Sequence, residues 1–216
     1  SVGDILKDRG KIPYRVNKIS FFDETELNLP DNVKNAFKSK TNESAIYSFD
    51  EKVHSSLGVE NYCHFTSPIR RIMDTWIHYF LTYHNIDSLD LDLVNKVDSM
   101  TKKFHRDVNI DSKIDNYFGD LTSKESFGYI YQIVSGNLIE IYLPELDIFK
   151  KVKVYDLKFD HLFDSSIEEK KLSVKYYQSQ LEFIVGNKID LIFEKKISLL
   201  PKDKLVIKIT NNFDLN

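Results

Sequence analysis

The sequence contains a single cysteine, no long apolar run and no excess of charge of one sign. With Cys63 alone, no internal disulfide can form, and we expect a reducing compartment such as the cytoplasm. No apolar run approaches the ~20 residues of a membrane span, and the opening residues lack the order of a secretory signal, so no membrane partner is expected. The 30 basic and 33 acidic residues leave a net charge of -3. Bulk charge therefore gives no reason to expect a polyanion partner, and any site for one has to be local.

What is present is the composition of a folded chain. Its 216 residues are 42% hydrophobic and 29% charged, enough for one substantial domain or two small ones. Residues 1–123 have mainly helical or irregular patterns, whereas residues 124–216 alternate as strands do. We therefore expect an α+β protein of two joined units with these bounds. The chain opens without an initiator Met and within a helical pattern, as a piece of something larger would.

The first half contains four predicted helices. The strongest signal is an apolar stripe at i, i+3, i+4, i+7 and i+8 spacing that runs from Ile69 to Leu81. A second long pattern predicts a helix from Leu91 to about Gly119, with a break near Asn109. Shorter helices are expected at residues 2–7 and 32–39, and the segment 41–65 is expected to be irregular or partly extended.

The second half contains short predicted strands at residues 126–134, 138–143, 149–155, 172–177, 181–185, 188–197 and 205–210. Gly136-Asn137 and Gly186-Asn187 are tight-turn signals, each expected to join two paired strands. Five or more short strands over this length favour a small barrel of the OB type.

One local pattern has the chemistry of a phosphate site. Thr66 or Ser67 is a preferred N-cap, and Pro68 suits the first helical position, so Arg70 is expected in the first turn of the helix. Free backbone N–H groups, hydroxyls and a guanidinium would then meet at the positive end of the helix dipole. Asp74, four residues after Arg70, is expected to orient its guanidinium. A capped helix with an early arginine is also common where nothing binds, so both interpretations stay open on this pattern alone.

The same residues carry a resemblance to a known family. The run YCHFTSPIRR, from Tyr62 to Arg71, resembles the YxHFTSPIRRYxD signature of the ribonuclease II / ribonuclease R (RNB) family of 3′→5′ exoribonucleases. The runs AIYS at 45–48 and PYRVN at 13–17 are similar to further elements of that family. The resemblance implies that residues 1–123 are the helical C-terminal portion of an RNB catalytic domain and residues 124–216 an OB-type β-barrel.

The resemblance also implies a reaction and roles for residues. Members of the family remove nucleotides from the 3′ end of single-stranded RNA and release nucleoside 5′-monophosphates, using Mg²⁺ held by a cluster of aspartates. The signature arginine that contacts the scissile phosphate matches Arg70, which we therefore expect to be catalytic. By the same resemblance His64, Thr66, Ser67 and Arg71 are expected to shape the channel that binds the RNA backbone.

The chain departs from the family pattern at several places. Ile72 and Tyr79 stand where the signature has Tyr and Arg, and Cys63 replaces a small residue. The family's aspartate cluster lies upstream of the element that PYRVN resembles, close to where this chain begins. We therefore expect Mg²⁺ to be held outside this chain, by an upstream RNB polypeptide, and the chain alone to be inactive. The alternative is a noncatalytic RNB-like subunit that binds RNA or acts as a scaffold.

No metal site is expected within the chain itself. Asp87, Asp90 and Asp92 have the spacing of a metal loop but lack the glycine and terminal Glu that such loops need. Asp111 aligns poorly with an acidic position of the family, and the six histidines show no metal-ligand spacing.

Overall fold

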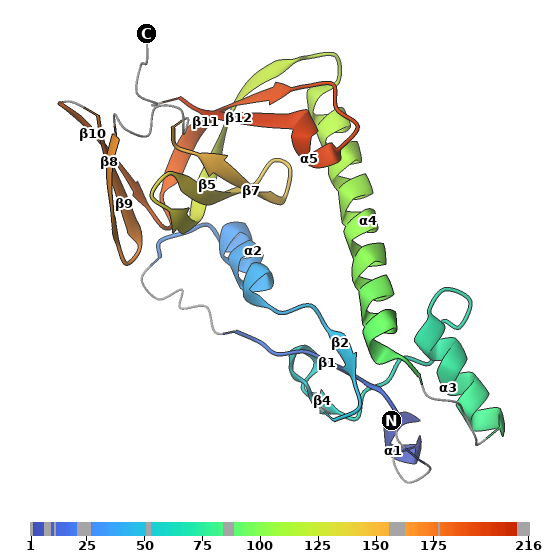
Figure 1. Ribbon diagram of the computed structural model, residues 1–216. Helices are drawn as coiled ribbons and strands as arrows, with labels where there is room; N and C mark the ends of the chain where they lie inside the picture. The colour runs from blue at the N-terminus through green and yellow to red at the C-terminus, as the bar shows by residue number, and fades with distance from the viewer. Residues whose placement is uncertain are drawn as a thin grey trace. The chain divides into compact units, whose positions relative to one another are not determined.

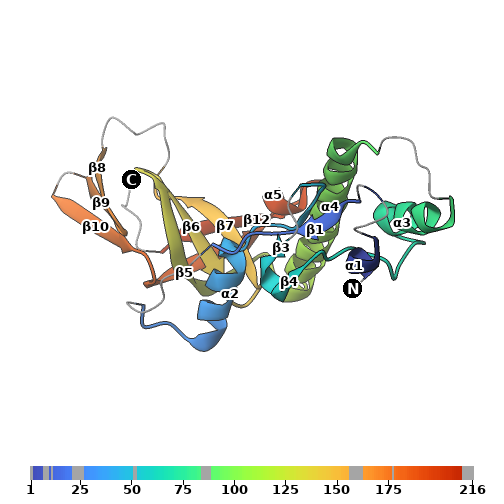
Figure 2. The same ribbon diagram turned by 90° about the horizontal axis from the view of Figure 1, so that it is seen from below.

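A computed structural model of the protein describes residues 2–6, 10, 12–20, 27–50, 53–83, 89–155, 163–176 and 178–210 (Figures 1 and 2). It is a mixed helix-and-sheet structure that divides into two compact units. The first unit comprises residues 1–22 and 38–104, and the second comprises residues 23–37 and 105–216. The boundary by contacts therefore lies inside a helix, near Phe104, and not at residue 123. The assignment of residues 1–123 and 124–216 to two domains stays a prediction.

The first unit combines short strands with helices. Strand β1 pairs antiparallel with β2, and β3 pairs antiparallel with β4. The stretch 41–65, expected to be irregular or partly extended, contains three of these strands. The elements are α1 (Val2–Leu6), β1 (Tyr14–Val16), β2 (Ile46–Ser48), β3 (Val53–His54), the 3-10 turn η1 (Ser55–Leu57), β4 (Val59–Glu60), α3 (Ile72–Tyr83) and the first half of α4 (Leu91–Phe118).

Helix α3 begins four residues after Pro68, the predicted first helical residue. Residues 68–70 form a turn, and the Arg71 carbonyl accepts the N–H of Thr75, so the helix begins at Ile72. The predicted stripe is confirmed at its centre, where Met73, Ile77 and Phe80 are buried. Ile69, expected to be the first residue of that stripe, is fully exposed, because it lies in the turn that precedes the helix.

Helix α4 is one unbroken element of 28 residues, so the predicted break near Asn109 is wrong (Figure 1). Asp90 caps it, with the carboxylate accepting the N–H of Leu93 at 2.9 Å. The end of the helix packs into the second unit, where Ile114 and Phe118 are buried in the core. This packing is why the boundary between the compact units lies upstream of the strands.

The second unit is built on two antiparallel sheets (Figure 2). The larger has the order β12-β11-β5-β6-β7, and the smaller has the order β10-β9-β8. One apolar core joins both sheets and the end of α4. The strands are β5 (Ser123–Ser135), β6 (Leu138–Leu143), β7 (Ile148–Lys153), β8 (Phe163–Glu168), β9 (Lys171–Tyr176), β10 (Ser179–Ile184), β11 (Lys188–Lys195) and β12 (Leu205–Ile209). The short helix α5 (Pro201–Lys204) precedes β12. Helix α2 (Asp31–Thr41) contributes its residues up to 37 to the second unit and the rest to the first.

The five-stranded sheet curls into a half-barrel. The pairing of β5 with β6 shifts register after Ile130 and again after Ile133, and such bulges bend a strand and increase its twist. Lys150, in one edge strand, donates a hydrogen bond to the carbonyl of Leu205, in the opposite edge strand, at 2.9 Å. The two edges of the sheet therefore approach each other at this point.

The two predicted turns have different outcomes. Gly136-Asn137 joins the paired strands β5 and β6, as predicted. Gly186-Asn187 does not join a pair, because β10 and β11 belong to different sheets. Here the Gly186 N–H and the Asn187 carbonyl instead form backbone hydrogen bonds with Ile130. The glycine adopts φ 92°, a conformation that suits the change from one sheet to the other. Strand β8 was not predicted.

Among the helices that the structure describes, none has the length and the apolar character needed to cross a bilayer.

Candidate nucleic-acid interface

The predicted site residues lie around the turn that leads into α3. This arginine turn, residues 66–71, is closed by the Ser67 carbonyl, which accepts the N–H groups of Arg70 and Arg71 at 3.2 and 3.1 Å. The hydroxyl of Thr75 secures it from the helix side by donating to the Pro68 carbonyl at 2.6 Å. The turn is thereby fixed to the first residues of α3, at the end of the helix that carries positive dipole charge.

Asp74 pairs with Arg71 and not, as expected, with Arg70. Its carboxylate is fully buried, and Oδ2 accepts the Ser67 N–H at 2.7 Å and Nη2 of Arg71 at 2.7 Å. The prediction assumed that residues 70 and 74 were one helical turn apart. Because α3 begins at Ile72, both arginines precede the helix, and the turn closed by the Ser67 carbonyl places Arg71 over the carboxylate.

Arg70 is exposed, and among the described residues its guanidinium has a single hydrogen bond, in which Nη2 donates to Oγ of Ser67 at 3.5 Å. Within the part of the chain that the structure describes, no carboxylate forms an ion pair with it. The turn therefore presents one unneutralised guanidinium next to the exposed hydroxyl of Thr66 and the half-buried hydroxyl of Ser67. This arrangement can bind a phosphate through charge-assisted hydrogen bonds.

His64 lies just before this turn and is held as a neutral ring. Its Nδ1 lies 2.7 Å from the hydroxyl of Tyr47. Burial, with the positive charges of Arg71 and Arg15, lowers the pKa of His64 to about 4. Burial raises the pKa of Tyr47 to about 12, so its hydroxyl keeps its proton. At neutral pH this pair supplies uncharged polar groups beside the arginine turn.

Arg15 is a buried support that the sequence did not single out as a site residue. It is 4% exposed, its Nη1 lies 3.1 Å from Oδ2 of Asp98, and its guanidinium carbon lies 4.5 Å from the centroid of the Tyr47 ring. Lys102 pairs with the same Asp98 oxygen at 2.7 Å. The position of Arg15 in the PYRVN run was the one sequence signal for its importance. Its partner Asp98 could not be predicted, because it lies 83 residues away in the sequence. Arg15 fixes Tyr47, and Tyr47 in turn holds His64.

Edge-to-face ring contacts continue this support. Tyr62 lies between His54 and His64, with centroid distances of 5.4 and 5.7 Å. On the helix side, His78 stacks on Phe65 at 4.2 Å, and its Nε2 lies 2.8 Å from the Phe65 carbonyl oxygen. Ring packing thus fixes the chain on the approach to the turn.

The acidic residues considered for a metal have other partners. Asp90 caps α4, Asp111 pairs with Lys204 at 2.5 Å, and Asp87 lies outside the described residues. No three His, Cys, Asp or Glu side chains within the described ranges come together as metal ligands would.

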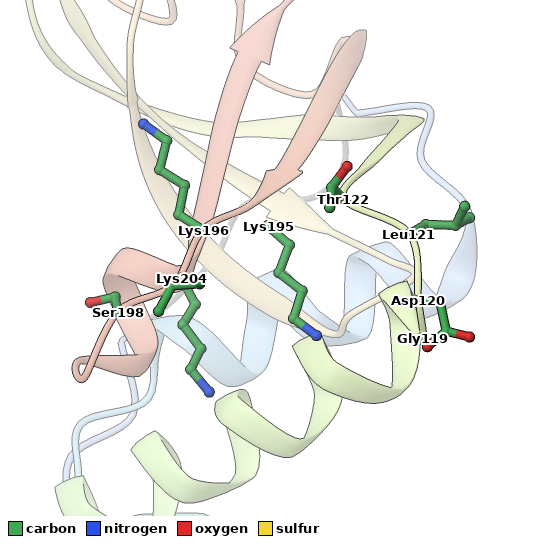
Figure 3. Close-up of a pocket in the computed structure, with 9 residues that line it drawn as sticks. Gly119, Asp120, Leu121, Thr122, Lys195, Lys196, Ser198 and Lys204 are labelled. Carbon is green, nitrogen blue, oxygen red and sulfur yellow. The ribbon is translucent and has the colours of Figure 1, made fainter.

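A pocket of about 410 Å³ lies in the second unit, between the end of α4 and the segment that follows β11 (Figure 3). Lys195, Lys196 and Lys204 line it. The ammonium groups of Lys195 and Lys204 each pair with carboxylates of α4, Lys195 with Asp115 at 2.9 Å. Since two of its three lysines are neutralised in this way, the pocket offers less free positive charge to a phosphate than three lysines suggest.

Known proteins resemble this chain in sequence and in fold. Residues 11–85, which include the arginine turn, match the RNB domain. Ribonuclease R of Ureaplasma parvum is 29% identical over 203 residues, which are 86% of this chain and 26% of the relative. Ribonuclease R of Mycoplasma genitalium is 24% identical over 161 residues, which are 68% of this chain and 22% of the relative. The chain thus spans about a quarter of the length of these curated relatives.

Solved structures show the same fold. The structure described as Mycoplasma genitalium RNase R in complex with ribose methylated single-stranded RNA superposes with a TM-score of 0.65 at 19% identity. The superposed region covers 96% of this chain and 39% of the RNase R chain. The apo form of that protein gives the same TM-score, identity and coverage. These relatives are all ribonucleases. More particularly, residues 11–85 match the RNB domain and both curated relatives are ribonuclease R proteins, so the chain is similar to the RNB family of 3′→5′ exoribonucleases.

Proposed function

We propose that this chain is the C-terminal portion of an enzyme that hydrolyses single-stranded RNA from its 3′ end to nucleoside 5′-monophosphates. The observation that carries the proposal is the arginine turn, where an exposed Arg70 with no carboxylate partner among the described residues lies in a segment matching the RNB domain. A structural relative was solved with single-stranded RNA, which supports RNA as the substrate class. The curled sheet of the second unit is proposed to be an OB-type barrel.

Arg70 acts at the scissile phosphate in this proposal. Negative charge accumulates on the phosphoryl oxygens as the bond to the leaving nucleotide breaks, and a fixed guanidinium stabilises that charge. The fixed turn holds the Arg70 backbone in place before RNA binds, which lowers the cost of ordering the site. His64, Thr66 and Ser67 supply uncharged donors and acceptors along the path of the RNA backbone.

The family's chemistry implies Mg²⁺, but the described residues do not form a site for it. Asp90 and Asp111 have structural partners, and no cluster of three ligands occurs within the described ranges. Because the family's aspartate cluster lies upstream of the element that PYRVN resembles, we assign Mg²⁺ to residues outside this chain, on the RNB polypeptide that corresponds to the unmatched part of the relatives. This chain alone would then not cleave RNA. With one cysteine, the cytoplasm or another reducing compartment is its proposed location.

The second candidate is a noncatalytic RNB-like protein that binds RNA or acts as a scaffold. Two departures from the signature favour it, Ile72 and Tyr79. Both side chains lie on the exposed side of α3, 62% and 51% exposed, so neither replacement was needed for packing. An intact TSPIRR run with a free Arg70 favours the enzyme.

The test is an RNA degradation assay on the full-length protein with 5′-labelled single-stranded RNA and Mg²⁺. The enzyme predicts stepwise shortening from the 3′ end and release of nucleoside 5′-monophosphates. Arg70→Ala should lower the cleavage rate by orders of magnitude, whereas RNA affinity should fall only by the several-fold that one lost phosphate contact costs and the melting temperature should change little. Absence of Mg²⁺-dependent shortening by the wild-type protein contradicts the enzyme and favours the second candidate. Equal loss of folding by Arg70→Ala would make Arg70 structural.

A further inference from the structure

We propose that the two adjacent arginines divide their work: Asp74 is a positioning residue that holds Arg71 inside the protein, so that Arg70 alone supplies phosphate-binding charge. This inference rests on the proposed function for its RNA readout only. It differs from the resemblance, which assigns Arg71 to the RNA channel, and from the expectation that Asp74 orients Arg70.

The geometry of Arg71 carries the first step. Its Nη2 donates to the buried Asp74 carboxylate at 2.7 Å and to Oγ1 of Thr66 at 3.3 Å. Its Nε is buried away from solvent and has no hydrogen-bond partner within the described structure. A guanidinium recognises a phosphate through two parallel N–H groups, and Nε with Nη2 forms one such edge. In Arg71 this edge faces the protein, so RNA cannot use it.

The charge balance carries the second step. Asp74 is fully buried, whereas the Arg71 side chain is 28% exposed. Burying a carboxylate costs free energy unless a cation and hydrogen bonds compensate it, and Arg71 and the Ser67 N–H do so at Oδ2, whereas the buried Oδ1 has no hydrogen-bond partner among the described residues. The positive charge of Arg71 is therefore committed to Asp74. Moving it to a phosphate would leave a buried, unpaired carboxylate.

The same carboxylate positions Arg70 indirectly, through Ser67. Asp74 accepts the Ser67 N–H and thereby holds Ser67 in place, and the Ser67 carbonyl in turn accepts the Arg70 N–H. Arg70 is left without an acidic partner among the described residues and faces solvent. One arginine thus stabilises the turn and the other remains available to RNA.

The first test needs no RNA. Melting temperatures of the full chain are measured for Arg71→Gln, Asp74→Asn and the double variant, and for Arg70→Gln alone and with Asp74→Asn. Loss of either member of the buried pair should lower the melting temperature by roughly 6 °C or more. The Arg71–Asp74 double variant should lose much less than the sum, whereas Arg70 and Asp74 should be additive. Coupling of Arg70 with Asp74, and none with Arg71, overturns the proposal.

The second test measures the salt dependence of binding to a single-stranded RNA oligonucleotide, at a temperature where each variant is folded. Each phosphate contact contributes about 0.7 to the slope of log affinity against log salt concentration for single strands. Arg70→Gln should lower the slope by about 0.7, and Arg70→Lys should retain it. Arg71→Gln, and its charge-retaining control Arg71→Lys, should leave it unchanged.

The outcomes separate this inference from the proposed function. A slope lowered equally by Arg71→Gln and Arg70→Gln overturns the division of work while RNA binding stands. A wild-type protein that binds no RNA contradicts the proposed function. The melting experiment then still decides whether Asp74 holds Arg71.

Discussion

His64 should make the first unit less stable as the pH falls from about 6.5 to about 4. Burial and two nearby arginines lower its pKa from 6.5 to about 4 in the folded protein. In that window the unfolded chain binds a proton at this residue and the folded protein does not. Since the unfolded state binds more protons, the free energy of unfolding decreases as the pH falls. Burial also lowers the pKa of His54, which acts in the same direction.

The size of the effect follows from the shift. A difference of about 2.5 pKa units corresponds to about 3.4 kcal/mol in full. The ring is only half-buried, so solvent screens part of this, and we expect roughly 1 to 2 kcal/mol between pH 7 and pH 4. The contribution is fully present above pH 6.5 and is lost as the pH falls through the folded pKa near 4.

Urea denaturation between pH 4 and pH 7.5 measures this dependence. The variant His64→Gln removes the titrating group, and its unfolding free energy should depend less on pH within the window. Met100→Leu, at an exposed position on α4 with no titrating group, is the control and should keep the wild-type dependence. An NMR titration that places the pKa of His64 near 6.5, or an unchanged slope in His64→Gln, would refute the reasoning.

Three further predictions concern the support of the site. Tyr47→Phe removes the hydroxyl that lies 2.7 Å from His64 and should cost about 1 kcal/mol in urea denaturation, with Tyr83→Phe on the exposed side of α3 as a neutral control. Asp90→Ala removes the cap of α4 and should lower the unfolding free energy by about 1 kcal/mol, whereas Asp90→Asn should retain most of it. Gly3→Ala would place a Cβ atom 1.8 Å from the Asn61 carbonyl oxygen and should lower the melting temperature; an unchanged value would contradict this packing.

The regular elements could be predicted because their signals are local. The stripe of α3 and the long pattern of α4 both correspond to helices, and the strand at residues 138–143 has the predicted bounds. The first residue of α3 could not be predicted from local signals. Pro68 after two hydroxyl residues is typical of a helix start, but here it begins a separate turn that Asp74 holds from inside the helix.

The position of the site in the sequence could be predicted, but the side-chain pairs within it could not. The run from Tyr62 to Arg71 located the turn, since the motif is contiguous in the sequence. Which arginine meets Asp74 depends on the turn that precedes the helix, and here that turn places Arg71 against the carboxylate. The support of Tyr47 by Arg15 and Asp98 joins three distant segments, which no local pattern reveals. For the same reason, Gly186-Asn187 resembled a hairpin turn although its two strands belong to different sheets.

The central claim is that the arginine turn binds an RNA phosphate through Arg70. A crystal structure of the full-length protein with a single-stranded RNA oligonucleotide tests it most directly. We expect a phosphate oxygen about 3 Å from the Arg70 guanidinium, with Arg71 still paired to Asp74. A phosphate held by Arg71, with Arg70 in solvent, would contradict it.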